Sequence, residues 1–89
     1  MAEYVRGQLS QVRLVELLDS KGIDRRAYDL NGANAGDQYV LDHQGRRWSV
    51  FYAERGHQTN RRDFDTEHAA CEHLLSLLLD DPTTRRSGG

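Results

Sequence analysis

The sequence predicts an α+β domain in which an N-terminal and a C-terminal helix pack on one face of a three- to four-stranded antiparallel sheet. Apolar residues recur at helical spacing before Gly22 and again after Thr66, whereas apolar and polar residues alternate over Gln38–His43. Glycine, asparagine and aspartate gather between these segments, as is typical of turns. The expected order is helix, strands, helix, and we place the aromatic segment Trp48–Gly56 at its centre as the central strand.

Length and composition indicate one small domain. The 89 residues suffice for a single core, and 37% hydrophobic and 29% charged residues are ordinary for a globular protein. The net charge of -2 lacks the basic balance typical of general nucleic-acid binding. A single cysteine, Cys71, excludes both an intrachain disulfide and a four-cysteine metal site.

We divide the chain into a flexible lead (1–8), a single α+β domain (9–81) and a disordered tail (82–89). Residues 1–6 lack the apolar run of a signal peptide, and no window is long enough to span a membrane. We therefore expect a cytoplasmic protein that does not associate with membranes. Gly88-Gly89 matches the end of ubiquitin-like modifiers, but helices at both ends of the domain do not fit their order.

The first helix is expected over about Leu9–Lys21. Its apolar residues lie three and four positions apart and form one stripe. Ser10 is a suitable cap if the helix begins after it, and Gly22 fits a left-handed helix end. Ile23 can then fold back onto the last turn.

Turn-forming residues dominate positions 24–37. We expect a brief helical turn at 24–28, a short edge strand at 28–30 and a loop at 31–37. A phosphate-binding loop needs a lysine followed by serine or threonine after its second glycine. Asp37-Gln38 stands there instead, which argues against nucleotide binding.

A hairpin with a Gln44-Gly45 loop is expected next, and it assigns the two faces of the sheet. The face expected to lie under the helices carries Tyr39, Leu41, Trp48, Val50 and Tyr52. The face expected to stay open carries Gln38, Val40, Asp42, Arg47, Ser49 and Phe51.

Gln58–Phe64 is expected to form the third strand, and the second helix follows it. Asp65 or Thr66 can cap this helix, and Glu67 suits its positive start. The helix ends before Pro82, because the residue that precedes a proline disfavours helical backbone.

Two possible chemical sites lie on the second helix. His68 and Glu72 are four residues apart and could bind a metal, and His68 could activate Cys71 as a nucleophile. Cys71 stands among apolar residues, however, where burial raises the pKa of a thiol. We interpret these residues as a buried cysteine and solvated histidines, and expect no enzyme activity, no metal and no cofactor.

Four arginine pairs suggest an alternative class of function. They are Arg25-Arg26, Arg46-Arg47, Arg61-Arg62 and Arg85-Arg86. Together with the element order, they resemble a double-stranded-RNA-binding domain. That module usually begins its last helix with lysines that face phosphates, whereas Asp65-Thr66-Glu67 stands here and would repel them. Solvated charges at turns are the interpretation we favour.

A series of short motifs resembles a family of small bacterial immunity proteins, encoded beside polymorphic or contact-dependent secreted toxins. The resemblance covers about residues 10–79. Its motifs are Leu14-x-x-Leu17-Leu18, Gly22-Ile23, Tyr28-x-Leu30, Tyr39-Val40-Leu41, Trp48-x-Val50-x-Tyr52-x-Glu54-Arg55-Gly56, Phe64-x-Thr66-Glu67 and Ala70-Cys71-x-x-Leu74-Leu75.

This resemblance implies a non-enzymatic inhibitor that binds the cognate toxin domain in the cytoplasm and blocks it stoichiometrically. Many such toxins are nucleases with basic clefts, so a net charge of only -2 leaves part of the recognition to shape and aromatic contacts. We expect a monomer when the protein is unbound. The expected toxin-binding residues lie on the open sheet face and its end: Asp37, Asp42, Arg47, Phe51, Glu54, Arg55 and Asp63. Glu54 and Arg55 could equally form a mutual ion pair.

Overall fold

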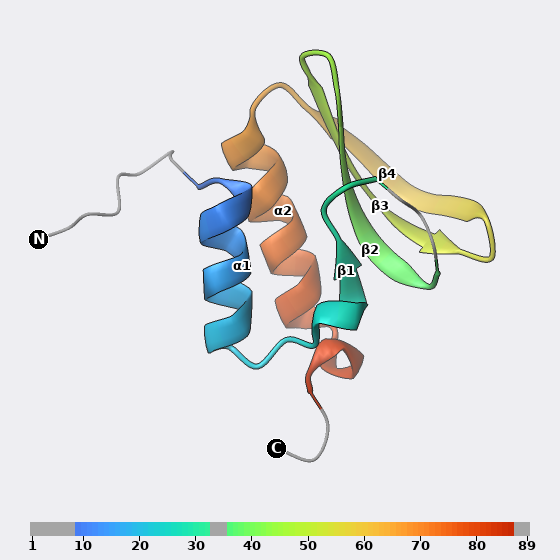
Figure 1. Cartoon of the computed structure of the whole chain (residues 1–89). Helices are drawn as coiled ribbons and strands as arrows, with labels where there is room; N and C mark the ends of the chain where they lie inside the picture. The colour runs from blue at the N-terminus through green and yellow to red at the C-terminus, as the bar shows by residue number, and fades with distance from the viewer. Residues whose placement is uncertain (1–8, 33–35, 87–89) are drawn as a thin grey trace, which may run out of the picture.

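A computed structural model describes residues 9–32 and 36–86, and shows two helices on one face of a four-stranded sheet (Figure 1). The sheet order follows the chain, β1-β2-β3-β4. The helices are α1 (Gln11–Ser20) and α2 (Glu67–Asp80), with short 3-10 turns η1 (Arg25–Ala27) and η2 (Pro82–Thr84). The strands are β1 (Tyr28–Asp29), β2 (Gln38–Gln44), β3 (Arg47–Glu54) and β4 (His57–Phe64). The predicted α+β class and helix placement are confirmed.

Helix α1 begins and ends at the residues that its sequence indicates. The Oγ of Ser10 accepts a hydrogen bond from the backbone N–H of Arg13 at 3.3 Å, which caps the N-terminus. Gly22 has a φ of 76°, and Ile23 N–H donates to the carbonyl of Leu18 at 3.0 Å. This six-to-one bond belongs to a Schellman ending and turns the fully buried Ile23 into the core.

Helix α2 begins beside the start of α1 and runs in the same direction (Figure 1). Thr66 caps it, because its Oγ1 accepts from the N–H of Ala69 at 3.1 Å. The next two side chains accept hydrogen bonds from the start of α1. Glu67 Oε2 accepts from Gln11 N–H at 3.0 Å, and His68 Nδ1 accepts from the N–H of Leu9 at 3.1 Å. The first turn of α2 thus satisfies backbone donors at the start of α1.

The β2–β3 hairpin turns one residue later than expected. Its loop is Gly45-Arg46 rather than Gln44-Gly45, with Gln44 opposite Arg47 and Leu41 opposite Val50. Gly45 has a φ of 61°, and a glycine at the first loop position is typical of a type II′ turn. The expected pairing is therefore wrong by two residues. An even shift leaves every side chain on its predicted face.

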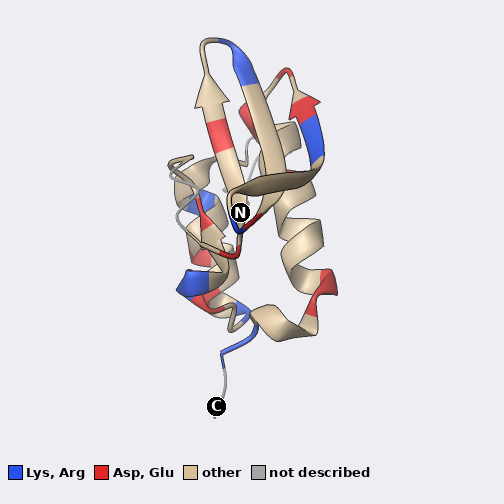
Figure 2. Cartoon of the chain, turned by 90° about the vertical axis from the view of Figure 1, so that its right-hand side faces the viewer, with Lys and Arg blue, Asp and Glu red and all other residues tan. Residues whose placement is uncertain are grey.

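The β3–β4 hairpin turns through Arg55-Gly56, both with positive φ (51° and 84°), as a type I′ turn requires. Halfway along β4 the register shifts between the pairs of Val50 and Tyr52, and Asn60 has a φ of 57°. Such a bulge bends a strand and increases its twist. In Figure 2 the first half of β4 accordingly crosses in front of the sheet.

The sheet is mixed, so the expectation of a purely antiparallel sheet is wrong. β1 pairs with β2 in parallel, with Tyr28 beside Tyr39 and Asp29 beside Val40. A strand of two residues carries no alternation that would indicate its direction. Its placement follows from η1, where Asp24 caps the turn by accepting from Arg26 N–H at 2.9 Å.

The main core lies between the helices and the predicted face of the sheet. Its fully buried members are Leu14, Leu18, Ile23, Leu41, Val50, Ala70, Cys71, Leu74 and Leu78. Tyr39 and Trp48 pack against this core while remaining partly exposed.

The opposite face of the sheet is not open, so the expectation that this face stays uncovered is wrong. Val40, Phe51 and Ala53 form a separate buried cluster there, and Phe51 is only 2% exposed. The guanidinium of Arg61 lies 5.9 Å from the centre of the Phe51 ring. A cation over an aromatic face is a favourable arrangement, and here it helps to cover the ring.

The chain stays ordered after α2, so the expected disordered tail is wrong for residues 82–86. Thr84 is 3% exposed, and its Oγ1 donates to the carbonyl of Leu78 at 2.8 Å. Arg85 forms a β-bridge with Ile23, and Arg86 lies 3.2 Å from a carboxylate oxygen of Asp19. Pro82 ends α2, but a proline suits the first position of a 3-10 turn, so the chain continues as η2. The expected flexible lead (1–8) and residues 87–89 lie outside the described part of the chain.

None of the described helices is both long enough and apolar enough to cross a membrane.

The same substitution at two valines, one buried and one exposed, tests the assignment of the core. Val50 is fully buried, whereas Val12 on α1 is 73% exposed. We expect Val50→Ala to lower the free energy of unfolding by roughly 1.5–3 kcal/mol, since it removes buried methyl groups and leaves a cavity. Val12→Ala should change it by less than about 0.5 kcal/mol. Urea denaturation of both variants measures the difference, and equal effects would contradict the core assignment.

Candidate functional site

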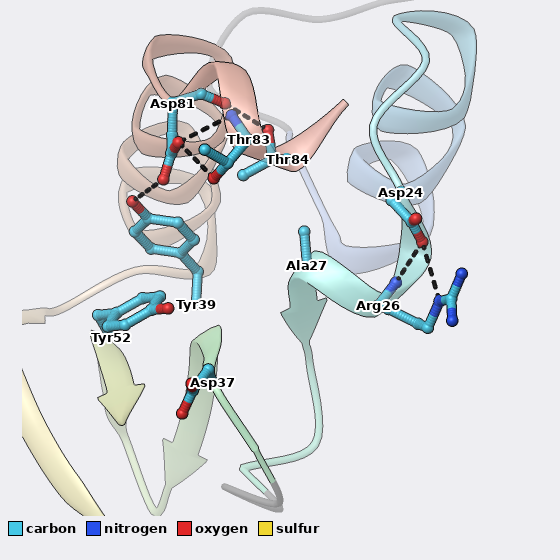
Figure 3. Close-up of a pocket in the computed structure, with 9 residues that line it drawn as sticks. All are labelled: Asp24, Arg26, Ala27, Asp37, Tyr39, Tyr52, Asp81, Thr83 and Thr84. Carbon is cyan, nitrogen blue, oxygen red and sulfur yellow. Dashed lines mark hydrogen bonds and ion pairs between the residues drawn. The ribbon is translucent and has the colours of Figure 1, made fainter. Parts of the chain in front are cut away.

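A groove crosses the end of the sheet where β2 begins and β3 ends. It consists of two adjoining cavities of about 210 Å³ and about 290 Å³ that share Tyr39, Tyr52 and Asp81. The first, drawn in Figure 3, is lined by Asp24, Arg26, Ala27, Asp37, Tyr39, Tyr52, Asp81, Thr83 and Thr84. The second adds Thr59, Asn60 and Leu77. We call the two together the tyrosine groove.

Two tyrosine rings form the floor that both cavities share. Tyr39 and Tyr52 are direct partners on β2 and β3, and their ring centres lie 4.8 Å apart with the planes at 65°. Edge-to-face pairs of this kind are favourable and fix the orientation of both rings. In Figure 3 the Tyr39 hydroxyl points toward Asp81, whereas the Tyr52 hydroxyl points into the cavity.

Asp81 joins the end of α2 to the sheet. Its Oδ2 accepts from the Tyr39 hydroxyl at 2.8 Å, and its Oδ1 accepts from the N–H and the hydroxyl of Thr83 at 3.0 and 2.7 Å. The hydrogen bonds from Thr83 and then Tyr39 lower the pKa of Asp81. Burial, followed by the bond to Asp81, raises the pKa of Tyr39 to about 12.

Further acidic groups surround the groove. Asp24 accepts from Arg26 N–H at 2.9 Å, and this bond lowers the pKa of the Asp24 carboxyl. Asp37 lies on the β2 side and accepts from Arg55 N–H at 3.4 Å. Burial raises the pKa of Tyr52, and the charges of Asp37, Glu54 and Asp81 raise it further. Three carboxylates therefore act on this hydroxyl.

Three of the predicted contact residues lie at this end of the sheet. Asp37 lines the groove, Glu54 is the exposed last residue of β3, and Arg55 follows it in the turn. Among the described residues, no ion pair or hydrogen bond joins the side chains of Glu54 and Arg55. The alternative interpretation, a mutual ion pair between these two residues, therefore does not hold.

The other predicted contact residues lie on the opposite sheet face, away from the groove. Asp63 accepts from Ser49 Oγ at 2.8 Å and from Arg61 Nε at 3.2 Å, and Arg47 Nη1 lies 3.6 Å from its second oxygen. These partners, the Ser49 hydroxyl first, lower the pKa of Asp63. Arg47 and Asp63 are therefore already paired within the chain.

Phe51 and Asp42 do not offer the contact surface that we expected. Phe51 is buried beneath Arg61 and cannot serve as an exposed aromatic anchor. Asp42 is partly buried, accepts from Gln44 Nε2 at 3.2 Å and lies against Gly32. The seven predicted residues thus divide between two places instead of forming one patch.

The residues weighed for catalysis have structural roles. Cys71 is fully buried, and desolvation raises the pKa of its thiol to about 12, so it is not a reactive thiolate at neutral pH. His68 accepts from the backbone of Leu9 through Nδ1 and lies 3.6 Å from Glu72 through Nε2. Within residues 9–32 and 36–86, no group of three or more His, Cys, Asp or Glu side chains could hold a metal ion.

Most of the paired arginines are compensated by carboxylates. Arg25 and Arg86 both contact Asp19, at 2.7 and 3.2 Å. The hydrogen bond from Arg25, followed by the charges of Arg25 and Arg86, lowers the pKa of the Asp19 carboxyl. Arg47 and Arg61 share Asp63 in the same way. The described surface therefore presents local ion pairs instead of the continuous basic stripe that phosphate binding needs.

Sequence reasoning placed the two tyrosines in the core and did not assign a role to Asp81. The signal that could have found the groove is the position of both rings at the end of the sheet, next to acidic turns. The structure brings acidic side chains and partly exposed tyrosine rings together at the tyrosine groove, whereas Phe51 lies in a buried cluster.

Comparison of the chain with models of known families, with curated proteins and with solved structures finds no match.

The bond between Tyr39 and Asp81 predicts a pH-dependent contribution to stability. Because the pKa of Asp81 is lowered from 3.8 in the folded protein, this contribution is fully present above about pH 3.8 and is lost as the pH falls through the folded pKa. A cycle of Tyr39→Phe, Asp81→Asn and the double variant should give a coupling of about 1 kcal/mol at pH 7. Urea denaturation from pH 7 to pH 3 measures it. A coupling that does not shrink at low pH would show that the carboxylate is not the acceptor.

Proposed function

We propose that this protein is an immunity protein, which binds a cognate secreted bacterial toxin domain in the cytoplasm and neutralises it by stoichiometric blocking. The toxin would be a nuclease or another enzyme that acts in the cytoplasm. The motifs over residues 10–79 that resemble small immunity proteins support this proposal. The observation that carries it is the tyrosine groove, an open surface feature that combines aromatic rings with acidic side chains.

The groove has the composition of a protein-binding surface. Tyrosine is enriched at interfaces, where its ring supplies contact area and its hydroxyl a hydrogen bond, and such residues often dominate the binding energy. Tyr39 and Tyr52 are held in fixed orientations before any partner arrives. Little conformational entropy is therefore lost on binding, which favours affinity.

The charges around the groove favour a basic partner. Three aspartates line the first cavity against one arginine, although the whole chain carries only -2. A local concentration of one sign attracts a partner of the opposite sign and excludes one of the same sign. A toxin domain with a basic substrate-binding surface meets this requirement, and the small net charge leaves shape and aromatic contacts a large share of the recognition.

Co-expression tests the proposed function directly. The proposal requires a large secreted protein encoded beside this chain, and the C-terminal domain of that protein is the partner to co-express. We expect the full chain to restore growth of cells that express this domain, and the two proteins to co-purify as a complex of fixed stoichiometry. A toxin domain from a different system serves as the control and should be neither neutralised nor bound.

Two results would overturn the proposal. One is continued growth arrest without a complex, although the chain is folded and present in excess. The other is salt-dependent binding of RNA or DNA by the purified chain without any protein partner, which would support the alternative of a nucleic-acid-binding module.

A further inference from the structure

We propose that the tyrosine groove holds one arginine side chain of its partner, with the guanidinium between the Tyr52 ring and the Asp37 carboxylate. The identification of the partner as a toxin rests on the proposed function. The preference of the groove for arginine follows from its own geometry, and the following four observations support it.

The first observation is that Asp37 retains most of its capacity to accept hydrogen bonds. A carboxylate offers about four acceptor positions. The Asp81 carboxylate accepts three hydrogen bonds, from Tyr39 and Thr83. Asp37, in contrast, accepts only one bond among the described residues, from Arg55 N–H at the long distance of 3.4 Å. A bound guanidinium would therefore find a free carboxylate oxygen here without displacing an internal partner.

The second observation concerns Tyr52. Its hydroxyl faces into the first cavity in Figure 3 and has no hydrogen-bond partner among the described residues. The ring is partly exposed and is fixed by its edge-to-face contact with Tyr39. An aromatic ring next to an open carboxylate suits a cation, because the face of the ring also attracts positive charge.

The third observation is size. Pockets for small-molecule ligands usually measure about 300–1,000 Å³. The first cavity, at about 210 Å³, lies below that range and suits a single side chain. The second cavity, at about 290 Å³, continues past Leu77 and Thr59 and offers room for the segment that carries this side chain.

The fourth observation is that the arginine at the rim does not occupy the cavity. The side chain of Arg26 is 93% exposed and lies beside Asp24, with 3.6 Å between Nε and Oδ1. In Figure 3 it points away from the two tyrosines. The charge of Asp37 thus remains unneutralised by any described side chain, and the cavity stays open to a cation from outside.

Arginine fits this arrangement better than lysine. The planar guanidinium can lie on a ring and at the same time donate parallel hydrogen bonds to a carboxylate, whereas the ammonium of lysine is a compact and strongly hydrated charge. The tyrosine rings are fixed at 65° to each other, and a carboxylate with free acceptor positions lines the same cavity, so the site favours the planar group.

A titration with short peptides tests the groove without the toxin. The probes are N-acetylated, C-amidated Gly-Arg-Gly, the same peptide with citrulline, which is nearly isosteric but neutral, and the same peptide with lysine. We expect the arginine peptide to shift the backbone amide resonances of Asp37, Tyr39, Tyr52 and Asp81 in the ¹⁵N-labelled protein. The citrulline peptide should bind at least about threefold more weakly, and so should the lysine peptide, since each loses part of the charged, planar contact.

Two matched variants locate the binding. Asp37→Asn should weaken binding of the arginine peptide at least about threefold, because it removes the open charge. Asp65→Asn makes the same change at an exposed aspartate before α2, outside the groove, and should leave the affinity unchanged. Equal weakening by both variants, equal affinity for arginine and citrulline, or equal affinity for arginine and lysine would each overturn the inference.

The two proposals fail in distinguishable ways. If the toxin complex forms and Asp37→Asn leaves its affinity unchanged, the arginine assignment is wrong and the immunity function stands. If the arginine peptide binds as expected and no toxin complex forms, the groove prefers arginine and the immunity function is wrong.

Discussion

The hydrogen bond from Tyr39 to Asp81 holds together the part of the molecule where α2, the C-terminal turn and the sheet meet. Asp81 ends α2 and caps η2, so one carboxylate fixes the helix end, the following turn and a tyrosine of β2. Once Tyr39 is fixed, its edge-to-face contact orients Tyr52. The groove is therefore a product of how the fold closes at this end.

The sequence predicted the elements well because their signals are local. Ser10, Gly22 and Thr66 begin or end helices through hydrogen bonds that each residue type is known to make. The assignment of side chains to the two sheet faces is correct although the predicted hairpin register is wrong. The register differs by two residues, and side chains along a strand also repeat every two residues. The parallel pairing of β1 could not be predicted from the sequence, because a strand of two residues is too short to show an alternation of apolar and polar residues.

The candidate site was predicted only in part because it depends on long-range geometry. Alternation correctly put Phe51 on the face away from the helices, but it could not show that β4 bends at Asn60 and that Arg61 covers the ring. Alternation also put Tyr39 and Tyr52 on the core face, which is correct, yet both stay partly exposed at the end of the sheet. Which aspartates gather there depends on η1, the β2 start and the end of α2, three segments distant in sequence.

The distribution of charge explains why a chain with a net charge of -2 can still present a strongly acidic site. Elsewhere on the described surface, two carboxylates are each paired with two arginines: Asp19 lies between Arg25 and Arg86, and Asp63 lies between Arg47 and Arg61. At the groove, Asp37 lies beside a tyrosine hydroxyl instead of an arginine side chain. Exposed ion pairs contribute little to stability and are screened by salt. The two clusters occupy the carboxylates of Asp19 and Asp63, whereas Asp37 has no arginine side chain beside it among the described residues and lies where two aromatic rings are already in position.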